Sequence, residues 1–228
     1  MDKNDSVNSN ATFEELQEQI SSLRQDIDLL KTDLIEDNTK FLPDPDGVMD
    51  FYDFDSRTMY LWEEITTETV LPIVRAINYF NREYISTKND QPITLFINCY
   101  GGDAMATLSL VDAIQSSEVP VITYNMGACF SGAFYILIAG TNRIASRNST
   151  CLIHDGDITI GNSLAKAENM FMFYSKTMAS KFKQIVLDNT RISEELLDSH
   201  AKDEWFISAD EALELGIVDT IDDEKRRW

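Results

Sequence analysis

Short apolar runs of strand length alternate with longer amphipathic segments through most of this 228-residue chain. Runs typical of buried strands cover residues 57–63, 92–100, 119–126 and 151–154, and helical patterns cover 66–84, 104–117, 164–189 and 208–216. Two buried strands that are joined by a helix pair in parallel, because the helix returns the chain to the edge at which the first strand began. The alternation therefore predicts an α/β fold with a largely parallel sheet.

A different apolar pattern occupies the N-terminal region. Its members follow one another in steps of three and four residues: Phe13, Leu16, Ile20, Leu23, Ile27, Leu30 and Leu34. This heptad spacing predicts a helix over 13–36 with one narrow apolar seam. The seam fits a helix docked on its own domain and equally a short coiled coil between subunits. We further expect a disordered tail over 1–12, a Pro- and Asp-rich linker over 37–50, and one main domain over 51–228.

The charge balance and the cysteines argue against several classes of function. The formal net charge is −20, whereas binding to a phosphate backbone needs a basic surface, so nucleic acid is not an expected ligand. No apolar run reaches the roughly 20 residues that span a bilayer, and the polar N-terminus lacks the apolar core of a signal peptide. The spacing of Cys99, Cys129 and Cys151 suggests neither disulfides nor a zinc site. We expect a cytoplasmic protein without metal, cofactor or membrane contact.

One hydroxyl interrupts the apolar stretch MGACFSGAFYILIAG over residues 126–140. This hydroxyl belongs to Ser131, whose small neighbours leave room for a substrate carbonyl, and a helix-like apolar run follows it. A Ser that leads from a strand into a buried helix resembles a nucleophile elbow, although the GxSxG motif is absent. A Ser that caps a core helix would have the same surroundings. The residues themselves leave both interpretations open.

A glycine pair and a histidine lie at the ends of predicted strands. In CYGGD (99–103), the glycines allow positive φ, and the free N–H groups at the start of the following helix suit a developing oxyanion. His154 ends the strand TCLIH and is a candidate general base, or a histidine satisfied by hydrogen bonds at a strand end. The other histidine, His200, is predicted to be solvent-exposed. Asp203 and Glu204 could orient the base, and both also fit as solvated charges.

Four segments together resemble the ClpP family, the proteolytic subunits of Clp proteases, within the wider ClpP/crotonase superfamily. They are LFINCYGGD, MGACFSGAFYILIAG, CLIHDG and WFISADEALELGIVDTI, and the resemblance covers roughly residues 50–225. The 29-residue separation of Gly102 and Ser131 also matches the family without a gap. The resemblance implies a repeated β-β-α superhelix with a protruding handle helix, here preceded by the N-terminal heptad helix.

The resemblance also implies the role of each candidate. Ser131 corresponds to the nucleophile and His154 to the general base, and the N–H groups of Gly102 and Gly132 correspond to the oxyanion hole. The register against ISADEA places Glu204 at the position of the family's third triad member. Asp203, one residue earlier, is of the family's residue type, and we prefer it with Glu204 as the alternative.

The implied function is that of an ATP-dependent serine endopeptidase subunit, which cleaves polypeptides through an acyl-enzyme. Members of the family form heptamers or tetradecamers that enclose a chamber, and an AAA+ unfoldase feeds them. The helix over 164–189 corresponds to the handle that interlocks two rings, and its wide apolar surface fits that role. Shortened members occur in bacteriophages, so the host cytoplasm is the expected location if the chain is viral.

The chain departs from the family pattern around the site. Tyr100 stands where the family has Pro, Gly132 where it has Met, and Asp155-Gly156 where it has Gln-Pro. At two further positions, Cys129 and Phe130, the family has small residues. These changes support an alternative in which the chain is a catalytically inactive subunit with a scaffold or assembly role.

Two other functions are compatible with parts of the pattern. A Ser–Lys dyad of the signal-peptide-peptidase type would use Lys166 or Lys176 and would not need His154. A crotonase-like acyl-CoA enzyme would share the fold and the oxyanion hole, but it would leave the Ser, His and acid without a purpose.

Overall fold

A computed structural model describes residues 17–29, 45–156, 161 and 163–223 of the chain, which forms two units, 1–52 and 53–228. In the first unit, residues 17–29 are helical, inside the predicted helix over 13–36. The seam residues Ile20, Leu23 and Ile27 are exposed. The predicted tail over 1–12, the ends of the predicted helix and the first part of the predicted linker lie outside the described residues.

The second half of the predicted linker is helical. Helix α2 (Pro45–Asp55) begins at a proline, which is favoured in the first turn because its missing N–H has no partner there in any helix. A segment rich in Pro and Asp, which suggested a linker, is thus equally compatible with the start of a helix.

The described part of the second unit contains a sheet of seven strands. They are β1 (Thr58–Leu61), β2 (Ile93–Cys99), β3 (Val121–Phe130), β4 (Asn142–Ser146), β5 (Thr150–Ile153), β6 (Trp205–Ser208) and β7 (Thr220–Asp222). The main order is β1-β2-β3-β4-β7, while β5 pairs with β3, and β6 pairs with β5. Every pair is parallel except β5–β6, which is antiparallel. The predicted α/β fold with a largely parallel sheet is confirmed.

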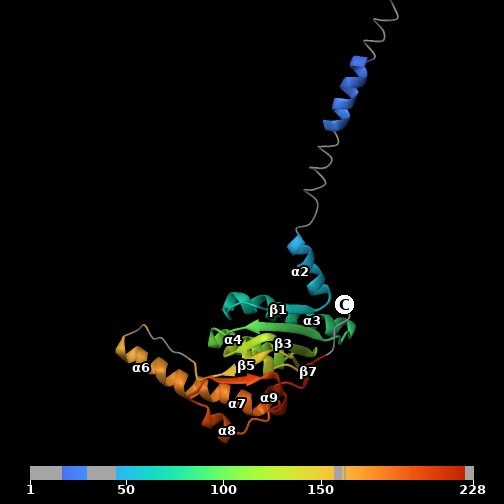
Figure 1. Ribbon diagram of the computed structural model, residues 1–228. Helices are drawn as coiled ribbons and strands as arrows, with labels where there is room; N and C mark the ends of the chain where they lie inside the picture. The colour runs from blue at the N-terminus through green and yellow to red at the C-terminus, as the bar shows by residue number, and fades with distance from the viewer. Residues whose placement is uncertain (1–16, 30–44, 157–160, 162, 224–228) are drawn as a thin grey trace, which may run out of the picture. The chain divides into compact units, whose positions relative to one another are not determined.

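Helices connect these strands (Figure 1). They are α3 (Thr67–Thr87), α4 (Ala104–Gln115), α5 (Gly132–Ile138), α6 (Leu164–Met172), the π-helical segment η1 (Phe173–Met178), α7 (Ala179–Asn189), α8 (Glu194–Ser199) and α9 (Ala209–Glu214). The predicted helix over 164–189 is thus interrupted by a π turn. In Figure 1, α6 projects from the sheet, and none of its side chains is buried. Within the described residues, no helix combines the length and the apolar character needed to cross a membrane.

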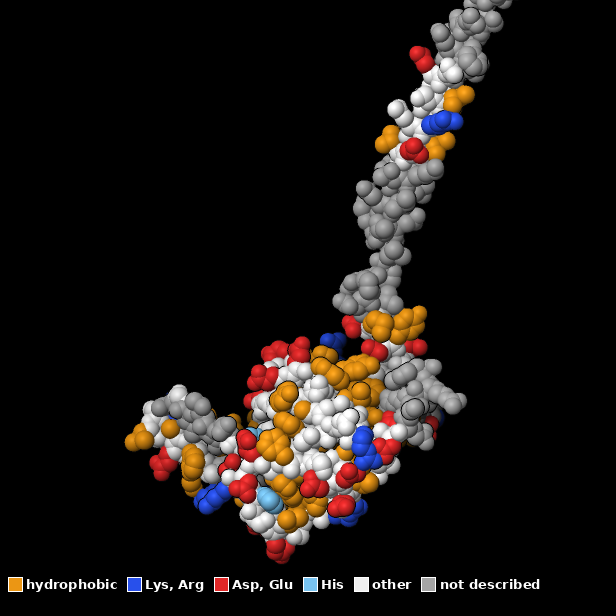
Figure 2. Space-filling model, viewed as in Figure 1, with side chains coloured by type: hydrophobic (Ala, Val, Ile, Leu, Met, Phe, Trp, Pro, Cys, Tyr) orange, Lys and Arg blue, Asp and Glu red, His pale blue; other side chains and the backbone are white. Residues whose placement is uncertain are grey.

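The core lies between the sheet and helices α3 to α5, and buried residues of α7 and α9 extend it. In β2, alternate residues are buried, from Ile93 to Cys99, as expected for a strand that turns one face to the core. Asp103 caps the start of helix α4, and its carboxylate accepts a hydrogen bond of 2.7 Å from the Ala106 amide. Acidic side chains are spread over the visible face of this unit, with few basic ones (Figure 2), in agreement with the net charge of −20.

Strand β3 changes its partner along its length, and this places the site. Its first part, Ile122–Asn125, pairs with β4, and its last part, Ala128–Phe130, pairs with β5. Because β3 and β5 are parallel neighbours, the residues that follow them, Ser131 and His154, emerge at the same edge of the sheet. Ligands of parallel α/β sheets bind at this carboxyl edge.

Candidate active site

Ser131 connects β3 to α5 in a conformation that few residues adopt. Its φ is 53° and its ψ is −122°, outside the left-handed region that Lys88 occupies at 59° and 24°. Such a backbone costs on the order of 1–3 kcal/mol and is found mainly at functional sites. The Ser131 side chain makes no capping hydrogen bond to α5. Of the two interpretations left open by the sequence, the geometry thus favours a nucleophile on a strand-to-helix turn.

The glycine pair packs directly against this turn. A Cβ at Gly101 would lie 2.8 Å from the Ser131 Cβ, and a Cβ at Gly102 would lie 2.3 Å from the Ile65 carbonyl oxygen. The Ile65 amide donates to the Gly101 oxygen at 2.9 Å, and the Ile65 oxygen accepts from the Asp103 amide at 2.7 Å. These two bonds hold the glycine loop against the segment before α3, so neither glycine has room for a side chain.

The amides of Gly102 and Gly132 lie beside each other. A Cβ built on Gly132 would be 3.6 Å from the Gly102 nitrogen. Neither amide donates a hydrogen bond to another described residue, and the Gly132 amide cannot have a partner in its own helix because it is the first of α5. Two free amides next to a strained serine can stabilise an oxyanion.

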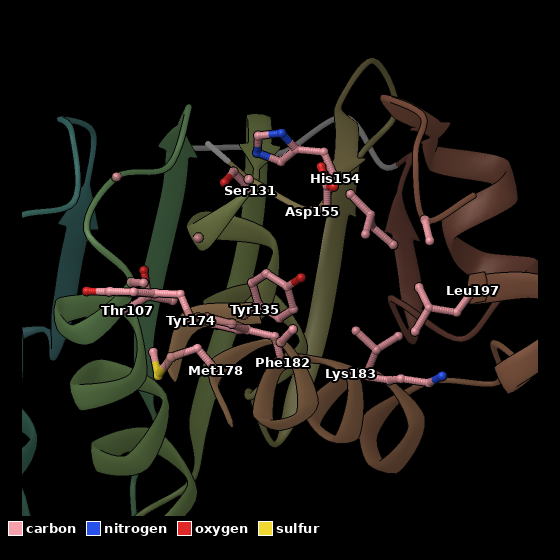
Figure 3. Close-up of a pocket in the computed structure, with 18 of the residues that line it drawn as sticks. Thr107, Ser131, Tyr135, His154, Asp155, Tyr174, Met178, Phe182, Lys183 and Leu197 are labelled. Carbon is pink, nitrogen blue, oxygen red and sulfur yellow. The ribbon is translucent and has the colours of Figure 1, made fainter. Parts of the chain in front are cut away.

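His154 reaches the same place from the end of β5. Figure 3 shows its imidazole beside Ser131 at one end of a pocket, with Tyr174, Met178 and Phe182 at the other end. The Nε2 atom of His154 is buried and has no hydrogen-bond partner among the described residues. Buried polar atoms without a partner are rare and call for an explanation, such as a proton that is exchanged in catalysis. No hydrogen bond joins Ser131 to His154 among the described contacts, and such bonds are often long in ligand-free enzymes.

Among the described contacts, no hydrogen bond or ion pair joins either predicted acid to His154. Asp203 and Glu204 lie in the exposed turn before β6. The Asp203 carboxylate lies 3.6 Å from Nδ1 of the other histidine, His200. Neither acid lines the pocket.

His200 itself was missed by the sequence analysis. Its ring stacks on Trp205 with a centroid distance of 4.2 Å and an interplanar angle of 13°, and it lines the pocket together with Asp198. The polar surroundings of His200 in the sequence suggested solvent. Trp205, five positions later, was the only local signal that His200 could pack against another side chain.

The pocket has a volume of about 710 Å³, and one of its walls is apolar. This wall comes from α5, α6, η1 and α7: Tyr135, Met170, Tyr174, Met178 and Phe182. Burial raises the pKa of Tyr135 to about 12, so its hydroxyl is neutral at pH 7. The wall therefore accepts an apolar side chain of a ligand.

The lysines are not placed for a Ser–Lys dyad. Lys166 and Lys176 do not line the pocket, whereas Lys183 does. Lys183 forms ion pairs with Asp198 at 2.6 Å and with Glu194 at 2.9 Å, which hold its charge away from Ser131. The described residues offer no lysine as a base.

The three cysteines form a row behind the site. Cys99, Cys129 and Cys151 are in register across β2, β3 and β5, and all three are free and buried. Burial raises the pKa of each thiol, in the case of Cys151 to about 12. They are therefore neutral packing residues at pH 7, and among the described residues no cluster of His, Cys, Asp and Glu could hold a metal ion.

The family model of the Clp protease matches residues 49–225. The chain belongs to the Clp protease family. Among relatives in this family, the ATP-dependent Clp protease proteolytic subunit 1 of Rhodopirellula baltica is 28% identical over 173 residues, covering 73% of this chain and 72% of the relative. The corresponding subunit of Deinococcus radiodurans is 29% identical over 143 residues, covering 62% and 70%. Subunit 2 of Prochlorococcus marinus is 27% identical over 169 residues, covering 72% and 80%.

The structure explains one departure from the Clp protease pattern, the glycine at position 132. A Cβ there would lie 2.5 Å from Thr107 Oγ1 and 3.0 Å from Ile65 Cδ1. Thr107 is fully buried, and its hydroxyl donates a hydrogen bond of 2.8 Å to the backbone carbonyl oxygen of Asp103. Since Thr107 and Ile65 fill the space of a side chain, a glycine keeps the amide of residue 132 in place.

Proposed function

We propose that the chain is a Clp-type serine endopeptidase subunit, which hydrolyses peptide bonds through an acyl-enzyme. The observation that supports this most is the convergence of three features at one end of the pocket. They are the strained backbone of Ser131, the adjacent free amides of Gly102 and Gly132, and the buried, unpartnered Nε2 of His154. Each of them is costly or unusual alone, and nucleophilic acyl transfer explains all three.

The reaction assigns one role to each group. The Ser131 Oγ attacks the peptide carbonyl carbon while His154 Nε2 takes the hydroxyl proton, and the carbonyl oxygen becomes negative between the Gly102 and Gly132 amides. The C–N bond then breaks, and His154 gives its proton to the leaving amine. A water, deprotonated by His154, releases the acid product and restores Ser131.

The third member of the triad is proposed to be Glu204 or Asp203. In the antiparallel pair, Ile153 lies opposite Trp205, so the next step of the register sets Glu204 opposite His154. Asp203, which the sequence analysis preferred, faces His200 instead. The register therefore supports Glu204, which would reach His154 by a side-chain rotation.

We expect Glu204→Gln to lower kcat by at least about 100-fold, because an amide in place of the acid favours the wrong imidazole tautomer. Asp203→Asn is the matched control and is expected to change kcat by less than about threefold. Steady-state kinetics on one peptide measure both. A large loss with Asp203→Asn and none with Glu204→Gln would instead assign the role to Asp203.

We also propose that the chain works as a heptamer or tetradecamer with the ClpP-type superhelix and is fed by an AAA+ unfoldase. The projecting α6 exposes Met170, Phe171 and Met172, which suits the handle of an interlocking ring. The seam residues of the helix over 17–29 are exposed as well, so a coiled coil between subunits would cover them.

Turnover and assembly can be measured on the same fractions. Size-exclusion chromatography with light scattering is expected to give particles of seven or fourteen subunits, and these particles should hydrolyse a short fluorogenic peptide without ATP. Short peptides need no unfolding, so the unfoldase is not required. Ring-sized particles without hydrolysis would contradict the endopeptidase, and a monomer that hydrolyses the peptide would contradict the assembly.

The alternative is a catalytically inactive assembly subunit. It is favoured by one observation: among the described residues, no hydrogen bond or ion pair joins either acid to His154. Ring-sized particles that never turn over peptide would be the expected result of this alternative.

A further inference from the structure

Three aromatic side chains cluster next to Ser131, outside the pocket. The ring centroids of Tyr100 and Phe130 are 5.3 Å apart, and those of Phe130 and Phe206 are 5.7 Å apart, with interplanar angles of 85° and 84°. Tyr100 precedes the glycine pair, and Phe130 precedes Ser131. None of the three lines the pocket that Tyr135 and Phe182 form. The site therefore has two separate apolar surfaces.

Two of the three rings of the aromatic cluster are largely exposed to solvent. Tyr100 is 77% exposed and Phe206 is 53% exposed, although each contacts another ring. Large apolar side chains that gather at a surface mark a contact with another molecule more often than isolated ones do. Two of the rings stand where the Clp protease pattern has Pro and a small residue, so the cluster is a feature of this chain.

The strand register places the cluster on the side of His154. Phe130 lies opposite Leu152, and Leu152 lies opposite Phe206, so the three form one row across β3, β5 and β6. His154 comes two residues after Leu152, and alternate residues of a strand point to the same face. Continued beyond the end of β5 at Ile153, this alternation sets His154, which also lines the pocket, on the face that carries the rings. In acyl transfer this imidazole protonates the leaving amine, so the leaving group must lie there too.

We propose that Tyr100, Phe130 and Phe206 form a subsite for the peptide residue that follows the scissile bond, and that it selects an aromatic side chain. This inference rests on the proposed endopeptidase function. The carbonyl is fixed between the Gly102 and Gly132 amides, and the leaving segment runs from it across the cluster. A ring placed there adds edge-to-face contacts and covers the exposed faces of Tyr100 and Phe206.

Two matched peptides and one ester test the subsite. The peptides differ only in Phe or Ala after the scissile bond, and the ester has the same acyl part with a methyl leaving group, which cannot reach the cluster. We expect the intact chain to cleave the Phe peptide about tenfold faster in kcat/KM than the Ala peptide, which is the effect of one favourable aromatic contact. Tyr100→Ser is expected to reduce this ratio to below about threefold while it leaves ester hydrolysis within about twofold.

Phe206→Ala is a second variant, because Tyr100 adjoins the glycine loop whereas Phe206 lies on β6. Phe206→Ala should also lower the ratio of kcat/KM between the Phe and Ala peptides. Tyr60→Ser is the control: Tyr60 is 50% exposed and also contacts two rings, Trp62 and Phe96, but it lies on β1 outside the cluster. Tyr60→Ser should change neither the rate of peptide cleavage nor the rate of ester hydrolysis.

The outcomes separate the subsite from the proposed function. A chain that hydrolyses the ester but shows the same Phe-to-Ala ratio in all variants would overturn the subsite alone. An equal loss of ester and peptide hydrolysis in both Tyr100→Ser and Phe206→Ala would show that the rings only support the site. A change of particle mass in these variants would assign the cluster to a subunit contact, and a chain that hydrolyses neither substrate would overturn the function and the subsite together.

Discussion

Ser131→Ala is expected to lower kcat for peptide hydrolysis by at least about 10⁴-fold, because it removes the hydroxyl that is proposed to form the acyl-enzyme. The fold should be kept, since the Ser131 hydroxyl makes no hydrogen bond that holds α5. The residual rate would come from binding and from the two amides. Initial rates on one fluorogenic peptide, compared with far-UV circular dichroism, measure both expectations.

The matched control for this variant is Ser86→Ala. Ser86 is exposed on α3, and its hydroxyl bonds only to carbonyl oxygens of its own helix. It should retain the wild-type rate. If Ser131→Ala kept a rate within about tenfold of the wild type, Ser131 would not be the nucleophile.

Gly102→Ala is expected to lower kcat by about 100- to 1,000-fold through loss of one oxyanion donor. The new Cβ would lie 2.3 Å from the oxygen and 2.7 Å from the nitrogen of Ile65. Both are backbone atoms, so the loop must move, and the Gly102 amide moves with it. KM should change less than kcat, because the oxyanion exists only in the transition state.

Gly161→Ala is the control for this second variant. No atom of the described residues lies within 4 Å of a Cβ at Gly161, and its backbone does not require a positive φ. Its rate and thermal midpoint should match those of the wild type. A normal kcat in Gly102→Ala would mean that the oxyanion is stabilised elsewhere.

The elements with a strong apolar period could be predicted from the sequence. Strands β1, β2, β3 and β5, and helices α3 and α4, lie where the alternation places them. Strand β4 was not predicted, because Ile144 and Ala145 alone give it no clear period, and it depends on pairing with β3 and β7. Pairing of this kind is tertiary, so local propensity does not reveal it.

The candidate site was predictable where it lies on regular structure. Ser131 and His154 follow neighbouring parallel strands, and Gly102 lies in the loop that packs against them. The sequence left the proposed acid open between Asp203 and Glu204, because both lie in an irregular turn. The Asp203 carboxylate lies close to the His200 imidazole, whose ring stacks on Trp205. No periodic pattern in the sequence predicts this contact between Asp203 and His200.

The central claim is that Ser131 is an activated nucleophile, and covalent labelling tests it most directly. The assembled wild-type chain is treated with a fluorophosphonate, which reacts with activated serines and releases fluoride, and its intact mass and peptide map are then measured. We expect one adduct per chain, located on Ser131, and no adduct in Ser131→Ala. A wild-type chain that remains unlabelled, or an adduct that persists in Ser131→Ala, would contradict the account.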